Sequence, residues 1–228
     1  MASLFEKYRP QTLGDVVGQD AAVGALKSFE TRGGFGGNAF WFAGPSGTGK
    51  TTIARILARA VAGDNPALGN VRELDAGQLT EARLLAIDRG TRGGKPLFCG
   101  GYAILVNEAH GLKPAVARLL LSVLEPIPSW VVWCFTTTTA GQALLFDRTE
   151  DAAPFLSRCK RFTLRGASNR SSDTAQAFAK RAAEIAGAEG LDGRAEAAYL
   201  NWLQAHGGNF RALLQHIECA GGAEEQLQ

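Results

Sequence analysis

The sequence lacks the features that mark membrane proteins, metal proteins and disulfide-rich proteins. No stretch approaches the roughly 20 apolar residues that cross a bilayer, and charge interrupts the first residues before an apolar signal can form. We therefore expect a cytoplasmic protein with no membrane contact. The cysteines are far apart and form no CxxC pair, so we expect them to be reduced and buried or half-buried. They are Cys99, Cys134, Cys159 and Cys219.

The sequence also has little net charge, only +2. A balanced charge excludes an overall basic field for nucleic acid, so any DNA contact has to come from a local patch. Arg83, Arg89, Arg92 and Lys95 form such a patch in a Gly-rich stretch, where they either meet phosphates or form a solvated loop. The 46% share of apolar residues is enough for one ordinary domain and a small companion.

The most informative segment reads GPSGTGKT from Gly44 to Thr51, directly after the apolar run Ala39–Ala43. A Gly-rich turn that opens a helix lets backbone N–H groups close around phosphates. In such a loop Lys50 reaches the terminal phosphates, and the Thr51 hydroxyl ligates Mg²⁺. The segment therefore predicts nucleotide binding. We expect contacts from Gly44, Pro45, Ser46, Gly47, Thr48, Gly49, Lys50, Thr51 and Thr52.

Up to about residue 165 the chain alternates between strand and helix patterns, which predicts a parallel sheet covered by helices. The expected strands are Ala39–Ala43, Val71–Leu74, Tyr102–Val106, Val131–Phe135 and Arg161–Leu164. The expected helices between them are Thr51–Val61, Thr80–Asp88 and Pro114–Leu124.

After a short polar linker, three helical patterns predict a small lid. Ser172 or Asp173 can cap the first helix, and the second stops at Gly207-Gly208. Asn209 can cap the third, which we expect to end at Gly221-Gly222. This pattern divides the chain into an α/β domain, a helical lid and a tail, at residues 1–165, 166–222 and 223–228.

A second nucleotide motif lies at the end of the apolar strand Tyr102–Val106, which delivers Asn107 and Glu108. Parallel α/β sheets bind ligands at the carboxyl ends of their strands. These two polar residues are therefore expected beside the phosphate-binding loop.

Together these motifs resemble the AAA+ ATPases, and within them the clamp-loader subunits of DNA replication, of the replication factor C and bacterial gamma/tau kind. The most specific stretch is EKYRPQTLGDVVGQ, from Glu6 to Gln19. In that family this stretch wraps the adenine base, which implies contacts from Arg9, Pro10 and Val17. The resemblance implies a P-loop AAA+ core with a parallel five-stranded sheet followed by a three-helix lid.

By the same resemblance Glu108 is the general base that activates the attacking water. The sequence departs from the family pattern at Asn107, where an aspartate is usual. An amide oxygen can still accept a hydrogen bond in the Mg²⁺ shell, but it brings no negative charge. We therefore expect Thr51 and Asn107 at the metal, and slower turnover.

Three further positions match family motifs. The segment Trp133–Thr139 resembles the sensor 1 strand end, with Thr137 at the polar position, although Thr136 could fill that role. Arg158, in Ser-Arg-Cys, resembles the arginine that reaches into a neighbour's ATP, which implies an oligomer. Arg211, after Gly207-Gly208, resembles the sensor 2 arginine that contacts the γ-phosphate in its own chain.

The resemblance implies ATP and Mg²⁺ as cofactors, a homo- or hetero-oligomeric AAA+ ring, and primer-template DNA and a sliding clamp as partners. It covers Glu6 to about Ala220, without the helical collar and the cysteine cluster of bacterial clamp-loader subunits. We expect either a chain cut after the lid or a compact stand-alone relative. Two other functions stay open: a nucleotide-binding assembly subunit that does not hydrolyse ATP, which Asn107 favours, and a Holliday-junction or recombination-type motor.

Overall fold

The computed structural model describes residues 3–64, 70–96, 100–139, 141, 150–191 and 194–224. The chain forms two compact units. One unit, here called the sheet unit, contains Gly24–Gly44 and Lys50–Thr163. The other, here called the lid unit, contains Met1–Val23, Pro45–Gly49 and Leu164–Gln228. The predicted division at residue 165 stays a prediction.

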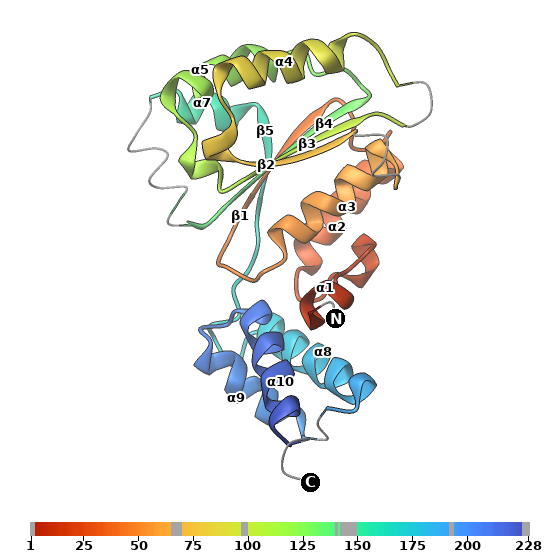
Figure 1. The fold of residues 1–228 in the computed structure, drawn as a ribbon, viewed down its shortest axis with the longest axis vertical. Helices are drawn as coiled ribbons and strands as arrows, with labels where there is room; N and C mark the ends of the chain where they lie inside the picture. Colours follow the sequence, from red (N-terminus) through yellow and green to blue (C-terminus); the bar gives the residue numbers. More distant parts are fainter. Residues whose placement is uncertain are drawn as a thin grey trace. The chain divides into compact units, whose positions relative to one another are not determined.

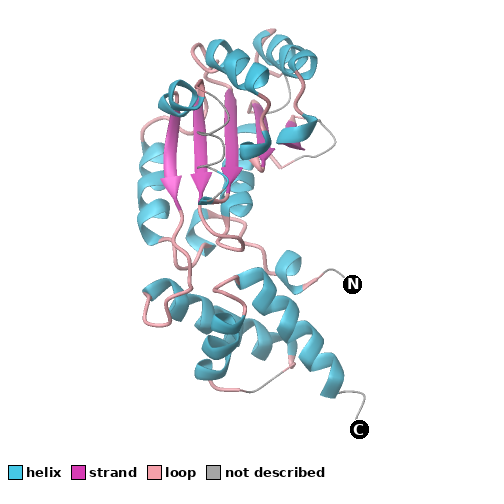
Figure 2. Ribbon diagram, turned by 90° about the vertical axis from the view of Figure 1, so that its left-hand side faces the viewer, coloured by secondary structure: helices cyan, strands magenta, loops and turns pink. Residues whose placement is uncertain are grey.

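The sheet unit is built on a five-stranded parallel sheet, as the sequence predicted (Figure 2). Its strand order is β2-β3-β4-β1-β5. The strands are β1 (Asn38–Ala43), β2 (Val71–Asp75), β3 (Tyr102–Asn107), β4 (Val131–Thr137) and β5 (Cys159–Thr163). The central strands are almost wholly buried, which explains why they read as continuous apolar runs.

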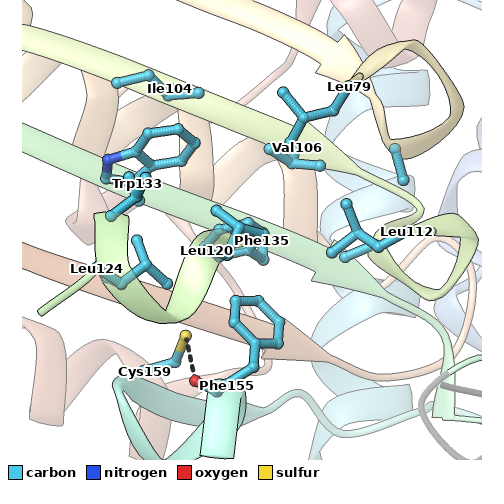
Figure 3. Close-up of a cluster of buried hydrophobic side chains, with 14 of the residues drawn as sticks. Leu79, Ile104, Val106, Leu112, Leu120, Leu124, Trp133, Phe135, Phe155 and Cys159 are labelled. Carbon is cyan, nitrogen blue, oxygen red and sulfur yellow. Dashed lines mark hydrogen bonds between the residues drawn. The ribbon is translucent and has the colours of Figure 1, made fainter. Parts of the chain in front are cut away.

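Helices cover both faces of this sheet (Figure 1). One face packs on α3 (Lys50–Ala62), and the other on α4 (Glu81–Arg92), α5 (Pro114–Val123) and α7 (Ala152–Ser157). Figure 3 shows the core on the second face, where Ile104 and Val106 of β3 meet Trp133 and Phe135 of β4. Because strand side chains alternate, Leu105 and Asn107 belong to the face of α3.

Several element boundaries differ from the sequence prediction by one to four residues, the largest difference being the end of α4 at Arg92 instead of Asp88. Strand β5 begins two residues earlier, at Cys159, and β4 continues to Thr137. The sequence pattern missed helix α2 (Asp20–Thr31). Only Val23 and Leu26 of that helix are buried, so its apolar stripe is too thin to reveal a helical period.

The lid unit contains α8 (Asp173–Glu189), α9 (Glu196–Ala205) and α10 (Phe210–Glu224). Ser172 caps α8 by accepting from the Ala175 N–H, and Asn209 Oδ1 accepts from the Ala212 N–H at 3.3 Å. These two caps agree with the sequence. The expected end of the third helix at Gly221-Gly222 is wrong, since α10 continues to Glu224. Glycine disfavours a helix by only about 1 kcal/mol per residue, so it need not end one.

The lid unit also includes the start of the chain, where α1 (Leu4–Lys7) buries Leu4 in the core of the lid helices. Lys7 Nζ lies 2.6 Å from Glu189 Oε1, and the Tyr8 hydroxyl donates to the same carboxylate. The Lys7 hydrogen bond is the main reason that the pKa of Glu189 lies below its usual value.

Short 3-10 turns occur in both units. They cover Leu13–Asp15 in the lid unit, and Ala76–Gln78 and Ala109–Gly111 in the sheet unit.

Two surface predictions change with the structure. Cys134 and Cys159 are buried as expected, but Cys219 is exposed, and Cys99 lies outside the described residues. Arg83, Arg89 and Arg92 belong to α4 and not to a loop. Arg92 pairs with Asp88 at 2.7 Å, one turn earlier on that helix.

Among the helices that the structure describes, none combines the length and the apolar character that a membrane span needs.

Candidate nucleotide-binding site

The sheet unit contributes both ends of the predicted phosphate-binding loop. Strand β1 ends at Ala43 and α3 begins at Lys50. The Lys50 ammonium donates to the Gly44 carbonyl at 2.9 Å, and the residue is only 9% exposed. An ammonium prefers ionised acceptors, so a phosphate would be a stronger partner for it than this neutral carbonyl.

At the carboxyl end of β3 the structure brings together two residues that the sequence had paired. The Thr51 hydroxyl donates to Asn107 Oδ1 at 3.3 Å. Thr136 Oγ1 of β4 donates to the same oxygen at 3.0 Å. The amide nitrogen of Asn107 donates to Glu73 Oε1 of β2 at 2.9 Å. Three neighbouring elements therefore converge on one side chain.

Glu108 follows Asn107 in a left-handed conformation, with φ 51° and ψ 45°. It is the one non-glycine residue with positive φ among the described residues. Such a conformation costs free energy and is typical of functional sites. The side chain of Glu108 is 58% exposed, and its Oε2 lies 3.4 Å from His110 Nδ1. The predicted general base is thus accessible at the strand end.

The two threonines that end β4 have different neighbours. Thr136 donates to Asn107, whereas Thr137 Oγ1 lies 3.1 Å from His110 Nδ1 and donates to the Thr138 carbonyl at 3.3 Å. The predicted sensor, Thr137, therefore joins the His110 and Glu108 side of the strand ends. His110 closes the second nucleotide motif in the sequence, where no role was predicted for it.

The lid unit contains the middle of the phosphate-binding loop, Pro45–Gly49. Thr48 Oγ1 donates to the Pro45 carbonyl at 2.9 Å, which closes the turn. Gly47 has φ +74°, and a Cβ there would lie 1.9 Å from Asn209 Oδ1 of the lid. Only glycine fits that backbone at that distance. The loop thus packs against the residue that caps α10.

Gln19 ties the opening stretch to the same loop. Its Nε2 donates to the Arg165 carbonyl at 2.9 Å and to the Thr48 carbonyl at 3.5 Å. Its Oε1 accepts from the Arg165 N–H at 2.9 Å. Gln19 is 3% exposed, so these bonds lie away from water. Gln19 is part of the stretch from Glu6 to Gln19 that resembles the family, but the sequence did not predict that it would link this stretch to the loop.

The residues predicted to contact the adenine base, Arg9, Pro10 and Val17, line one pocket of the lid unit. The pocket has a volume of about 430 Å³. That volume is within the range of small-molecule sites. Hydrogen bonds from Thr12, chiefly from its backbone N–H, hold the pKa of Asp15 in this pocket below its usual value. The pocket is lined by Lys7, Tyr8, Arg9, Pro10, Gln11, Gly14, Asp15, Val17, Arg181 and Glu184.

Arg158 lies between α7 and β5, away from the residues grouped around Asn107 by hydrogen bonds. Its Nη1 donates to the Pro154 carbonyl at 3.0 Å, and its Nη2 lies 3.9 Å from Glu125 Oε2. The Nε is buried and has no acceptor among the described residues. A guanidinium with an unused donor is suited to an additional anionic partner.

Arg211 lies in the first turn of α10, as the sequence indicated. Its guanidinium carbon is 5.4 Å from the centre of the Phe5 ring, in a cation–π contact with the start of the chain. The structure therefore gives Arg211 an aromatic partner within the lid unit. Its predicted contact with the γ-phosphate stays a prediction.

The donor set at Asn107 fits a Mg²⁺ ion held together with phosphate oxygens. Mg²⁺ prefers hard oxygen ligands and usually takes one or two from protein. The Thr51 hydroxyl and the Asn107 amide oxygen face each other, with the Glu73 carboxylate behind the amide. Within the described part of the chain, no three His, Cys, Asp or Glu side chains form a closed metal site.

Comparison with protein families gives one match over most of the chain. The sequence model of the "ATPase family associated with various cellular activities (AAA)" matches residues 40–186. The Haloarcula marismortui replication factor C small subunit is 52% identical over 61 residues, 27% of this chain and 18% of that protein. The DNA polymerase III subunit gamma/tau of Mycobacterium tuberculosis is 32% identical over 165 residues, 62% of this chain and 28% of that protein.

Solved structures give the same fold. The RuvB Holliday junction branch migration motor of Thermotoga maritima superposes with a TM-score of 0.63 at 23% identity, over 92% of this chain and 64% of that one. A DNA polymerase III gamma subunit-related protein from the same organism gives 0.56 at 14% identity, over 86% and 57%. The chain spans 18% and 28% of the two curated relatives, so it corresponds to a part of their length.

Proposed function

The chain belongs to the AAA family of ATPases, and on that premise we propose that it binds ATP with Mg²⁺ and hydrolyses it. The observation that carries the proposal is the meeting of the Thr51 hydroxyl and the Asn107 amide oxygen at 3.3 Å. Two motifs 56 residues apart are brought together there, and Thr51 directly follows the buried Lys50. These groups supply the phosphate and metal contacts of a nucleotide-hydrolysing site.

The roles follow from the chemistry of each group. Lys50 meets the terminal phosphates, because its charge is the one that the loop's neutral N–H donors lack. Thr51 and Asn107 face the metal, which when bound neutralises phosphate charge. Glu108 is the general base, since its exposed carboxylate can accept a proton from water. Arg9, Pro10 and Val17 contact the adenine base, and Arg211 senses the γ-phosphate.

We further propose that the active form is an oligomer of the clamp-loader type. The support is the Arg158 side chain, whose buried Nε has no acceptor among the described residues, and the similarity to replication factor C and DNA polymerase III subunits. Arg158 then stabilises charge in a neighbour's transition state. Primer-template DNA and a sliding clamp are the proposed partners of that assembly.

The second candidate is a subunit that binds ATP without hydrolysing it. The neutral amide of Asn107 favours this function, because the metal there loses the carboxylate that the family pattern provides. Both candidates require nucleotide binding, and only the first requires turnover. The similarity to RuvB, at 23% identity, supports the fold alone.

Nucleotide binding is tested first by titrating a fluorescent ATP analogue into the wild type and the Lys50→Ala variant. Removal of a charged hydrogen bond costs roughly 1.5–3 kcal/mol, so we expect affinity to fall about 10- to 100-fold. Lys27→Ala is the matched control, because it removes the same charge from an exposed position on α2. Equal affinity in the wild type and Lys50→Ala would contradict the assignment of the phosphate-binding loop.

A further inference from the structure

The environment of Asn107 contains a carboxylate that the sequence motifs do not include. Glu73 lies on β2, the edge strand beside β3, and accepts from Asn107 Nδ2 at 2.9 Å. The register pairs Asp75 with Asn107. Because side chains alternate along a strand, Glu73 points to the same face as Asn107, the face of α3. The carboxylate missing at position 107 is thus present one strand away.

Glu73 decides which end of the Asn107 amide faces Thr51. An amide can turn over and exchange its oxygen for its nitrogen, and a threonine hydroxyl accommodates either end because it both donates and accepts. An ionised carboxylate only accepts. With Glu73 in place, the NH₂ group has to point to β2 and Oδ1 to Thr51. The reversed amide would put two acceptor oxygens 2.9 Å apart.

A second contact holds Glu73 in place. Arg55 Nε donates to Glu73 Oε2 at 2.9 Å and Arg55 Nη2 to Oε1 at 3.1 Å. This bidentate pair of hydrogen bonds fixes the plane of the Glu73 carboxylate. Arg55 follows Thr51 by four residues on α3, so both point to the same side of that helix. One helix therefore carries the predicted metal ligand and the residue that orients Glu73.

We propose that Glu73 is a positioning residue that lets an asparagine work where the family pattern has an aspartate. Glu73 keeps the amide oxygen towards Thr51 and Mg²⁺, and keeps the NH₂ group, which would repel the cation, away from it. An aspartate would not need this help, since both of its oxygens accept. The inference rests on the proposed function in one respect, the role of Thr51 at the metal.

The test is a double-variant cycle that measures ATP affinity with Mg²⁺ and with EDTA. The ratio of the two affinities is the readout, and it requires no turnover. In the wild-type background we expect Glu73→Gln to reduce the ratio by about tenfold, the lower end for residues that orient metal ligands. Affinity in EDTA should not change, and the exposed Glu30→Gln of α2 is the matched control.

In an Asn107→Asp background the same substitution should act in the opposite direction. The carboxylate introduced by Asn107→Asp alone would face the Glu73 carboxylate with a like charge, whereas Glu73→Gln together with Asn107→Asp restores an amide opposite a carboxylate. We expect the double variant to recover at least the wild-type ratio. If the Asn107→Asp single variant does not fold, an unchanged ratio in Glu73→Gln still overturns the positioning role, and a reduced ratio in Glu73→Gln that returns to the wild-type value in the double variant still supports it.

The outcomes separate the two proposals. A wild type that does not bind ATP in either buffer contradicts the proposed function. If the wild type binds with a clear Mg²⁺ gain, but Glu73→Gln leaves the ratio unchanged, or lowers it equally in both backgrounds, Glu73 is only a structural ion-pair partner of Arg55. Reversal of the effect of Glu73→Gln between the two backgrounds supports the positioning role.

Discussion

The sheet unit and the lid unit assemble their candidate nucleotide groups in different ways. In the sheet unit the groups stand at the ends of adjacent strands and are joined directly, as Asn107 is to Thr136 and Glu73. In the lid unit they come from three separate stretches of the chain. Buried polar links such as Gln19, together with close packing at Gly47, join those stretches.

The two arrangements differ in how firmly they fix the groups and in how much they depend on single contacts. Strand ends have their positions fixed by the sheet ladder, which suits groups that must hold a reacting atom in place. A cluster built from distant segments depends on a few polar links, so a change in one of them affects the whole cluster. Under the proposed function, the reacting groups therefore belong to the sheet unit, and the lid unit is the one more sensitive to the loss of a single polar link.

The largest effect should come from Arg158→Ala, which tests whether the chemistry of the sheet unit is completed by a neighbour. Arginine fingers contribute roughly 10³–10⁵ in rate in other nucleotide hydrolases, so we expect a loss of that order in the assembled protein with ATP affinity unchanged. Arg161→Ala, on the exposed side of β5, is the matched control. Phosphate release and nucleotide titration measure the two quantities.

A mixture of Arg158→Ala and Lys50→Ala chains shows whether the finger acts on a neighbour. Some interfaces then pair an intact nucleotide site with an intact Arg158, so activity should partly return. Lack of recovery, in a mixture shown by sedimentation to co-assemble, would place Arg158 outside the neighbour's site.

A smaller effect is expected from Gln19→Leu, which tests the dependence of the lid unit on single polar links. The substitution leaves the Arg165 N–H and the carbonyls of Arg165 and Thr48 without their partner. A buried unsatisfied group costs roughly 1–3 kcal/mol, and we expect a loss of that order in the free energy of unfolding by urea. Gln215→Leu, exposed on α10, should change it by less than about 0.5 kcal/mol.

The smallest effect concerns cysteine reactivity, which compares the interior of the sheet unit with the surface of the lid unit without changing a residue. Burial raises the pKa of the Cys159 thiol to about 12 and that of Cys134 still further. A thiol reacts as its thiolate, so neither should be alkylated at pH 8 until the sheet unit unfolds. Cys219, exposed on α10, should react at once. Peptide mass mapping reports each cysteine separately, and early labelling of Cys134 would contradict the packed core.

Much of the sheet unit could be predicted because its signals are local. Apolar runs mark the strands, and the loop around Lys50 and the end of β3 carry their own motifs. Glu73 could not be found in this way, because its partner depends on β2 lying beside β3, and strand order is a property of the whole fold. The same limit applies to His110, which meets Thr137 across two strand ends.

In the lid unit the caps were predictable and the links were not. Ser172 and Asn209 are local signals, since each bonds to a backbone N–H three residues later. The partners of Gln19 lie 29 and 146 residues away, and no periodicity of the sequence indicates them. The predicted end of α10 was wrong because the pair Gly221-Gly222 was taken to stop the helix, although glycine only weakens one.

The central claim, that this chain hydrolyses ATP with Glu108 as the base, is tested most directly by the Glu108→Gln variant. The amide keeps the size and polarity of the side chain but cannot accept a proton from water. We predict unchanged ATP affinity and a fall in steady-state phosphate release of roughly 10²–10⁴-fold, measured at concentrations where the chain assembles. Equal rates in the wild type and Glu108→Gln would contradict the claim and favour a subunit that binds ATP without hydrolysing it.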